Sequence, residues 1–178
     1  AEDALMTLKL FNKQLEIFKQ RGEDELLSIA FELEFNFIYV LASMEQKGIK
    51  IDVKLLKEYK DRSLIYLNEL TQNIYEACGE SFNINSPKQL GVILFEKLEL
   101  ASSKKTKTGY STDESVLESL KNEHKVVPLL LKYREAFKLH STYIEPLLEL
   151  GLKDSENRVF SSFLHTGTTT GRLSSKNP

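Results

Sequence analysis

A run of basic and hydroxyl side chains between residues 104 and 112 has the composition of a phosphate-binding loop. It reads Lys-Lys-Thr-Lys-Thr-Gly-Tyr-Ser-Thr, with lysines at positions 104, 105 and 107. Ammonium groups attract phosphates, hydroxyls and backbone amides donate short hydrogen bonds, and a glycine lets the backbone approach closely. A solvated surface loop has a similar composition, so this segment by itself leaves both interpretations open.

A second run, from Thr168 to Ser175, reads Thr-Thr-Thr-Gly-Arg-Leu-Ser-Ser. The guanidinium of Arg172, held among hydroxyl side chains, can reach the hydrogen-bond acceptors that every base pair presents in the minor groove. A Ser/Thr/Gly linker is the alternative interpretation. The spacing Gly, four residues, then Gly-Lys-Ser/Thr is missing, which excludes the nucleotide-binding P-loop.

Residues 86–89, Ser-Pro-Lys-Gln, predict the start of a helix. Ser86 can cap the first amides, and Pro87 suits the first helical position because its missing N–H has no partner there. The open amides beside Lys88 form a ready anion site. Ordinary helix capping explains the same residues without a ligand.

Other chemistries find little support in the residues. The three histidines, His124, His140 and His165, do not have the spacing of metal ligands, and no Gly-x-Ser-x-Gly turn is present to activate a serine. Paired acids such as Asp113-Glu114 lie at expected helix starts, where the helix dipole explains them. The single cysteine, Cys78, excludes an internal disulfide.

Apolar residues at helical spacing predict the elements that position these segments. A first helix covers residues 4–18 and stops at Gly22, and a second covers 26–44 and ends before Gly48. A third runs from about Val53 to Cys78, with Asp52 placed to accept hydrogen bonds from its first amides.

Two of the predicted helices carry narrow apolar seams. One seam lies within 53–78, and the other runs from Val127 to Leu148 and ends at Gly151. Seams of this kind favour a long antiparallel helix pair, although a general helical bundle fits the periodicity equally well. Between them, a short helix to about Lys97, the loop 101–112 and a further helix start form a helix-loop-helix tip. Residues 157–164 are weakly strand-like, so the predicted fold class is mainly α.

The overall composition is that of a soluble globular chain. The 178 residues are 41% hydrophobic and 28% charged, with a net charge of -2. Basic character is concentrated in residues 83–112, where five lysines face two glutamates. No uninterrupted apolar run approaches the roughly 20 residues of a membrane span. One cysteine fits a reducing compartment, so we expect a cytoplasmic protein without a membrane partner.

Motifs along nearly the whole chain resemble those of family A DNA polymerases, the bacterial DNA polymerase I type. They are Ala1-Glu2-Asp3-Ala4, Gly48-Ile49-Lys50-Ile51-Asp52, Phe82-Asn83, Ser86-Pro87-Lys88-Gln89-Leu90, Lys104 to Thr112, Tyr133-Arg134-Glu135, Ser141-Thr142-Tyr143 and Thr170 to Ser175. Their order and spacing make a chance match very improbable.

The resemblance implies a domain organisation. Residues 1–22 would end a 3′–5′ exonuclease-like domain, 23–52 would connect it to the thumb, 53–151 would form the thumb, and 152–178 would enter the palm. We therefore expect the DNA-gripping part of a larger template-dependent DNA polymerase, a nucleotidyltransferase of DNA replication and repair. The palm carboxylates and the fingers helix that receives the nucleotide are not in this sequence, so the chain alone should be inactive.

The resemblance also implies site residues. The expected DNA contacts are Asn83, Ser86, Lys88, Lys104, Lys105, Thr106, Lys107, Ser111, Thr112, Arg134, Lys138, Thr170 and Arg172. Arg172 would lie against the primer-terminal base pair, and Asp3 matches a metal-binding carboxylate of the proofreading site. Implied partners are primer-template DNA and deoxynucleoside triphosphates, with Mg²⁺ as cofactor and a monomeric enzyme.

Some residues differ from the family pattern, and two other functions are compatible with the sequence. Phe160-Ser161 and Leu164-His165 stand where the family usually has His-Thr and Asn-Gln. One alternative is a stand-alone helical module that binds duplex DNA without catalysis. Another is a helical interaction protein that binds no nucleic acid, from which the lysines at 104–107 could be removed without consequence.

Overall fold

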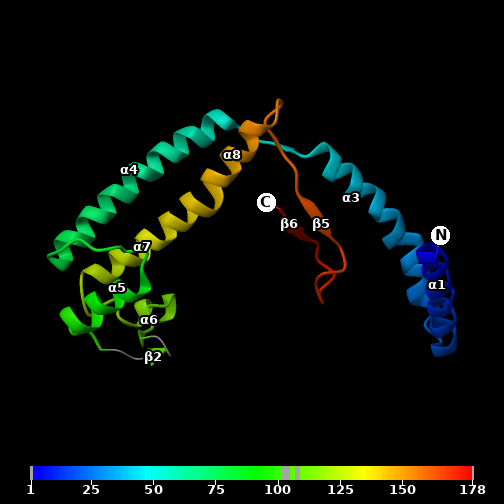
Figure 1. The fold of residues 1–178 in the computed structure, drawn as a ribbon, viewed down its shortest axis with the longest axis horizontal. Coiled ribbons are helices and arrows are strands. Elements are labelled where there is room, and N and C mark those ends of the chain that lie inside the picture. The colour runs from blue at the N-terminus through cyan, green and yellow to red at the C-terminus, as the bar shows by residue number, and fades with distance from the viewer. Residues whose placement is uncertain (1, 102–104, 107–108, 178) are drawn as a thin grey trace. The chain divides into compact units, whose positions relative to one another are not determined.

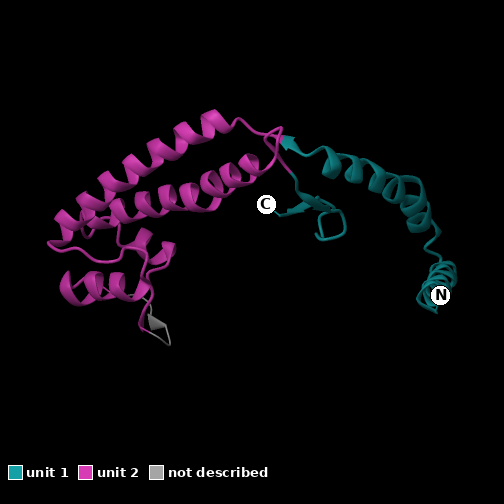
Figure 2. Cartoon of the chain, turned by 45° about the horizontal axis from the view of Figure 1, so that its top comes forward, with its two compact units in different colours: residues 1–49, 160–178 teal, residues 50–159 magenta. Residues whose placement is uncertain are grey.

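The computed structural model describes residues 2–101, 105–106 and 109–177, with side chains left undescribed at 105 and 106. The chain forms two compact units, one of residues 50–159 and one of residues 1–49 with 160–178 (Figure 2). Helices make up most of both units (Figure 1), which confirms the predicted mainly α class. Each unit is described in turn.

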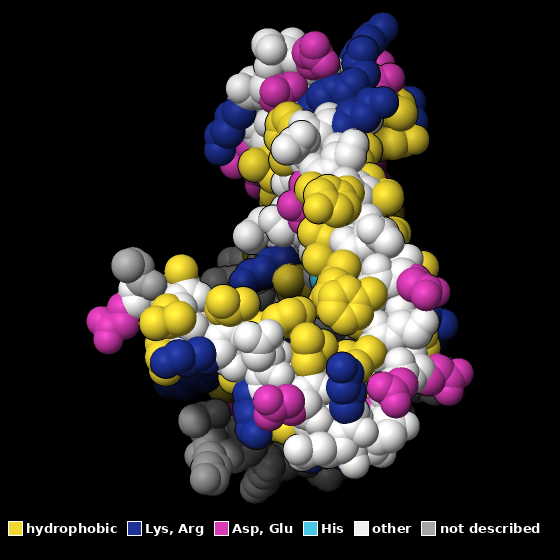
Figure 3. Space-filling view, turned by 90° about the vertical axis from the view of Figure 1, so that its right-hand side faces the viewer, with side chains coloured by type: hydrophobic (Ala, Val, Ile, Leu, Met, Phe, Trp, Pro, Cys, Tyr) yellow, Lys and Arg dark blue, Asp and Glu magenta, His cyan; other side chains and the backbone are white. Residues whose placement is uncertain are grey.

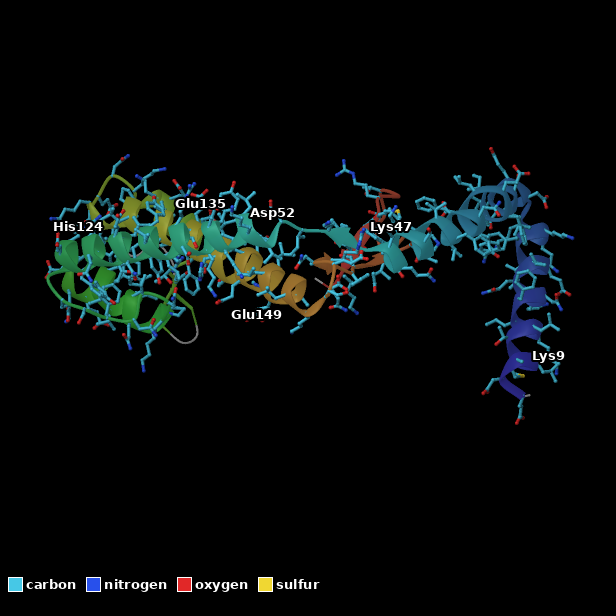
Figure 4. The ribbon with its side chains drawn as sticks, turned by 90° about the horizontal axis from the view of Figure 1, so that it is seen from above. Lys9, Lys47, Asp52, His124, Glu135 and Glu149 are labelled. Atoms are coloured by element: carbon cyan, nitrogen blue, oxygen red, sulfur yellow. The ribbon has the colours of Figure 1, made fainter. Side chains whose placement is uncertain are left out.

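A long helix, α4 (Val53–Cys78), forms one side of the stalk in the unit 50–159. It begins at Asp52, whose carboxylate accepts a hydrogen bond from the Leu55 amide at 2.9 Å, and it ends at Gly79, with φ of +78°. Figure 4 labels Asp52 near the start of this helix. The predicted bounds and cap are confirmed, because both depend on local residues.

The other side of the stalk is a continuous helix built from α7 (Val126–Lys138), the π-helical turn η3 (Leu139–Ile144) and α8 (Glu145–Lys153). It runs antiparallel to α4 (Figure 1). Two contacts fix the alignment: Ser63 Oγ lies 2.7 Å from His140 Nδ1, and Lys60 Nζ lies 2.7 Å from Glu145 Oε1. The predicted helix pair is therefore confirmed.

The sequence suggested that this helix ends at Gly151, but in the structure it does not. The helix continues to Lys153, and Gly151 is buried. A Cβ atom at this position would lie 2.2 Å from Cδ1 of Ile51. The glycine is thus required by close packing against the segment before α4, and the predicted boundary of the thumb at 151 falls inside the helix.

The tip contains α5 (Pro87–Val92) continued by the π-helical turn η2 (Ile93–Lys97), and then α6 (Glu114–Ser119). Ser86 caps α5 as predicted, since its Oγ accepts from the Gln89 amide at 3.4 Å. The expected loop differs from the structure: β2 (Lys105–Thr106) and β3 (Gly109–Tyr110) form an antiparallel hairpin, with Lys105 opposite Tyr110.

One apolar core joins the stalk to the tip. Its buried residues come from α4, from the segment that leads to α5, and from α5–η2, α6 and α7: Leu67, Leu70, Ile74, Ile84, Leu90, Leu94, Phe95, Val116, Leu117, Leu120, Val126, Val127, Leu130 and Tyr133. Because helices from both regions share this core, the tip is held rigidly on the stalk. At the other end of the unit, β4 (Arg158–Val159) pairs with β1 (Ile49–Lys50).

The unit of residues 1–49 and 160–178 begins with the helix α1 (Glu2–Arg21). A second, continuous helix follows, made of α2 (Asp24–Ile29), η1 (Ala30–Glu34) and α3 (Phe35–Lys47). The strands β5 (Ser162–Leu164) and β6 (Ser174–Lys176) form an antiparallel hairpin. The Glu45 carboxylate accepts from the Phe163 amide at 2.6 Å and ties α3 to β5. Gly22 and Gly48 end the two helices with positive φ, as expected.

Hydrophobic side chains cover much of the surface of the helices in this unit. Figure 3 shows many exposed hydrophobic side chains in yellow, in a view where the right-hand side of Figure 1 faces the reader. Among the described residues one helix, Asp24–Lys47, is long and apolar enough by length and composition to cross a membrane, since an 18-residue window of it has a mean hydropathy of 1.5. The sequence contains no uninterrupted apolar run of this length, because Glu32 and Glu34 interrupt it. Those two carboxylates would be costly in hydrocarbon.

Candidate nucleic-acid interface

Several of the expected DNA-contacting residues meet around one concavity on the tip. This hollow has a volume of about 720 Å³, and its lining includes Ser86, Lys88, Gly109 to Asp113 and Arg134. The residues come from three places in the chain: the start of α5, the end of the β2–β3 hairpin, and α7. The fold thus brings the predicted anion site at Ser86 beside the end of the predicted phosphate-binding loop.

One wall of the concavity is the turn that leads into α5. Asn83 is exposed, and its side-chain oxygen accepts from the Asn85 amide at 3.0 Å. Asn85 in turn donates to the hydroxyl of Tyr133 at 3.1 Å, and this bond fastens the turn to α7. Lys88 is exposed in the first turn of α5, where the open amides and the ammonium group present positive charge together.

The opposite wall is the base of the hairpin. The ring of Tyr110 packs against that of Phe95, with centroids 4.9 Å apart and planes at 33°. A Cβ atom at Gly91 would lie 3.3 Å from the Tyr110 Cβ, so the glycine in α5 lets the hairpin approach closely. The hairpin is therefore anchored at Tyr110. Lys104 and Lys107, which the sequence analysis placed in this loop, lie outside the described residues.

Ser111 and Thr112, which were both expected to contact DNA, are deeply buried. Their exposed fractions are 2% and 5%. Ser111 Oγ accepts from the Asp113 amide at 3.3 Å, and Thr112 accepts two hydrogen bonds from Arg134. Both hydroxyls thus have partners inside the protein, and their direct contact with DNA stays a prediction.

Arg134 is half-buried, and its environment is partly acidic. Burial lowers the pKa of Arg134 from its ordinary value, while the charges of Asp113 and Glu114 act in the opposite direction. The guanidinium remains protonated, since an arginine side chain keeps its charge in proteins. Two nearby carboxylates offset part of the attraction that this charge would exert on a phosphate.

A second concavity, of about 530 Å³, extends along α6 and α7. Its charged lining includes Lys138, one helical turn after Arg134, and also Lys121 and Lys132, which belong to none of the motifs found in the sequence. Lys121 lies in the turn after α6 and Lys132 lies in α7, and neither has a phosphate-binding motif around it, so only their shared surface identifies them. Glu114, Glu118 and Glu135 line the same hollow and temper its positive charge.

Thr170 and Arg172 belong to the other unit, in the turn before β6. Both residues are exposed. Thr168 Oγ1 donates to the Arg172 carbonyl at 2.7 Å, and Gly171 has φ of +71°. The hydroxyl run was expected to hold the guanidinium. In the structure, a threonine hydroxyl instead fixes the backbone at Arg172, and the tight turn needs the glycine.

Metal-binding geometry is missing from the described part of the chain. Asp3 lies exposed in the first turn of α1, and within residues 2–101, 105–106 and 109–177 no group of three or more His, Cys, Asp or Glu side chains could hold a metal ion. The histidines have other roles: His124 Nδ1 accepts from the Val126 amide at 3.2 Å, and His140 is buried against Ser63.

Comparison with known proteins gives one consistent result. The family described as DNA polymerase family A matches residues 53–178. The chain is 47% identical over 167 residues to DNA polymerase I of Bacillus subtilis, and the match covers 94% of this chain. It is 44% identical over 179 residues to DNA polymerase I of Borreliella burgdorferi, with all of this chain covered.

A solved structure shares the fold. The polymerase domain of Pol1 from M. smegmatis, in complex with DNA primer-template and dNTP, is 34% identical and superposes with a TM-score of 0.76 over 90% of this chain. The match covers 28% of that structure's chain, and the two bacterial relatives above are covered to 18% and 19%. The chain thus spans about a fifth of the length of these curated relatives.

Proposed function

The chain belongs to DNA polymerase family A, and from that premise we propose that it forms the DNA-gripping part of a template-dependent DNA polymerase. The observation that carries this proposal is the concavity on the tip, which is lined by the start of α5 and by the base of the β2–β3 hairpin. The described lining carries Lys88 and Arg134 together with Glu96 and Asp113, and in this proposal the lysines of the hairpin add the positive charge that attracts the phosphates of a duplex.

The grip is expected to be independent of base sequence. Contacts from lysines, hydroxyls and amides to phosphates position the duplex but do not read its bases. Arg172 has a different role in the proposal: it lies against the primer-terminal base pair and hydrogen-bonds to minor-groove acceptors that all base pairs share. The whole enzyme would then add deoxynucleotides to the primer 3′ end, in DNA replication and repair.

We propose Mg²⁺ as the cofactor of the whole polymerase, but the described residues do not provide a site for it. No cluster of candidate ligands surrounds Asp3 among them. We therefore derive no catalytic step of this chain through a metal, and Asp3 as a proofreading carboxylate remains a hypothesis. A monomeric enzyme in the cytoplasm, without a membrane partner, completes the proposal.

The proposal is tested by measuring how the 178-residue chain binds fluorescein-labelled primer-template DNA at increasing salt. Substituting Lys104, Lys105 and Lys107 by Ala should weaken binding and reduce the slope of log K against log salt by about 3, close to one unit per lost phosphate contact. A matched control replaces Lys54, Lys57 and Lys153, which are exposed at the other end of the stalk. The control should leave the slope near its original value.

Three results would count against the proposal. No measurable binding by the unsubstituted chain would favour a helical interaction protein. Equal slopes in the tip variant and the control variant would move the DNA site elsewhere. If the chain binds DNA strongly but the full-length protein that contains it does not extend a primer, the stand-alone DNA-binding module would be favoured.

A further inference from the structure

Arg134 uses its guanidinium inside the protein. From α7 the side chain reaches Thr112, where Nη1 donates to the carbonyl oxygen and Nη2 donates to Oγ1 at 3.2 Å. Two of its five N–H donors thus hold two acceptors of one residue, a fork that an ammonium group cannot reproduce.

Thr112 is the point where the hairpin joins the body of the tip. It is the second residue after the end of β3 and lies two residues before the start of α6, and it is 5% exposed. Three elements fix this short segment: Gly91 of α5 and Phe95 of η2 pack against Tyr110, and Arg134 of α7 holds Thr112. Among these contacts, the one from Arg134 connects the hairpin base to the stalk.

The guanidinium lines the tip concavity, and its surroundings there are partly acidic. The Arg134 side chain is half-buried, and the charges of Asp113 and Glu114 act on it. A phosphate that approached would meet these carboxylates as well as the cation. Lys138, one turn later on α7, is exposed and better suited to direct contact.

We propose that Arg134 is a positioning residue, which holds Thr112 and thereby sets the wall of the tip concavity that faces Lys88. This inference rests on the proposed function, because the concavity matters only if the tip grips DNA. It assigns Arg134 an effect on DNA affinity that passes through Thr112 rather than through a phosphate.

The test compares Arg134→Lys with Arg134→Ala in the 178-residue chain. Lysine keeps the charge and binds phosphates well as a point charge, but it cannot hold both acceptors of Thr112. Arg134→Lys should therefore lose about as much affinity for primer-template DNA as Arg134→Ala does, on the order of tenfold, the scale of one charged hydrogen bond.

A second measurement is made without DNA. Amide NMR signals and hydrogen exchange of Gly109 to Asp113 should change in both Arg134 variants, because the wall is no longer held. The matched control is Lys138→Ala on the same helix, which should leave those amides unchanged and lower the salt slope by about 1.

The outcomes separate this inference from the proposed function. The positioning role would be overturned if Arg134→Lys kept the DNA affinity that Arg134→Ala loses, or if the amides of Gly109 to Asp113 did not change in the two variants. Either result would leave the proposed DNA grip standing. An unsubstituted chain that does not bind DNA would overturn the proposed function, and this inference with it.

Discussion

The two units bury their apolar side chains to very different extents. In the unit 50–159, the side chains of Ile74, Leu94, Leu117 and Leu130 are all less than 2% exposed. In the other unit, α1 buries none of its residues, and Leu10 and Leu33 are 59% and 61% exposed. The stalk and tip thus carry a core of their own, whereas the described residues of 1–49 and 160–178 pack much less densely.

This contrast teaches where stability and function should lie. Apolar area removed from water is the main source of folding free energy, and side chains that stay exposed contribute little of it. We therefore expect the unit 50–159 to provide most of the stability of the chain. A phosphate grip benefits from that rigidity, since its charged groups keep their positions before DNA arrives.

The largest expected effect is a loss of stability from a core truncation. Leu130→Ala removes a fully buried side chain and should lower the free energy of unfolding by about 2–5 kcal/mol. Leu10→Ala, at an exposed position of α1, should change it by less than about 0.5 kcal/mol. Urea unfolding followed by circular dichroism measures both. Similar losses from the two variants would break the contrast between the units.

The second effect concerns the functional difference between the units. In the full-length polymerase proposed above, Arg172→Ala should slow primer extension at saturating DNA by up to about a hundredfold, while DNA affinity changes little. The reason is that a small misplacement of the 3′-hydroxyl is costly to the rate. Slowing should be clearest from a correctly paired primer end. Weaker binding with normal extension would make Arg172 another phosphate contact.

The third effect probes close packing inside the unit 50–159. Gly151→Ala places a Cβ atom 2.2 Å from Ile51 Cδ1 and should cost about 1–3 kcal/mol of stability through overpacking. Combining it with Ile51→Ala should cost less than the sum of the two single substitutions, because the second one removes the clash. Additive losses in thermal unfolding would show that the two residues do not press on each other.

The smallest effect comes from the Lys60–Glu145 ion pair that links α4 to α8. The hydrogen bond from Lys60 lowers the pKa of Glu145 below its ordinary 4.5, and the bond to Glu145 raises the pKa of Lys60 above 10.5. The Glu145 contribution is therefore present above pH 4.5 and lost as pH falls through its lowered pKa. The Lys60 contribution is present below pH 10.5 and lost as pH rises through its raised pKa.

Glu145→Gln should thus lower the melting temperature slightly near neutral pH and have no effect at the acid end. Added salt should shrink the difference, because both side chains are partly exposed. Glu118→Gln, in the more exposed Lys121–Glu118 pair, is the control and should change less. An effect of Glu145→Gln that persists at low pH would point to a packing defect instead.

The sequence by itself determined the local features of this protein. Asp52 and Ser86 cap their helices as expected, and the apolar seams predicted the stalk pair. These features depend on residues within one or two turns, so periodicity and cap chemistry suffice to find them. The family was also recognisable from motifs alone, because the resemblance rests on residue types and spacing.

Only the tertiary structure decided the features that join distant segments. The sequence suggested that Gly151 ends a helix, whereas in the fold Gly151 makes room for Ile51. Nothing in the sequence indicated that Arg134 holds Thr112, and the expected contact of Arg134 with DNA stays a prediction. The hairpin in the tip likewise pairs residues that were expected to form an open loop. Such roles depend on which side chains the packing of α4, α7 and the tip brings together, and local sequence patterns do not specify that packing.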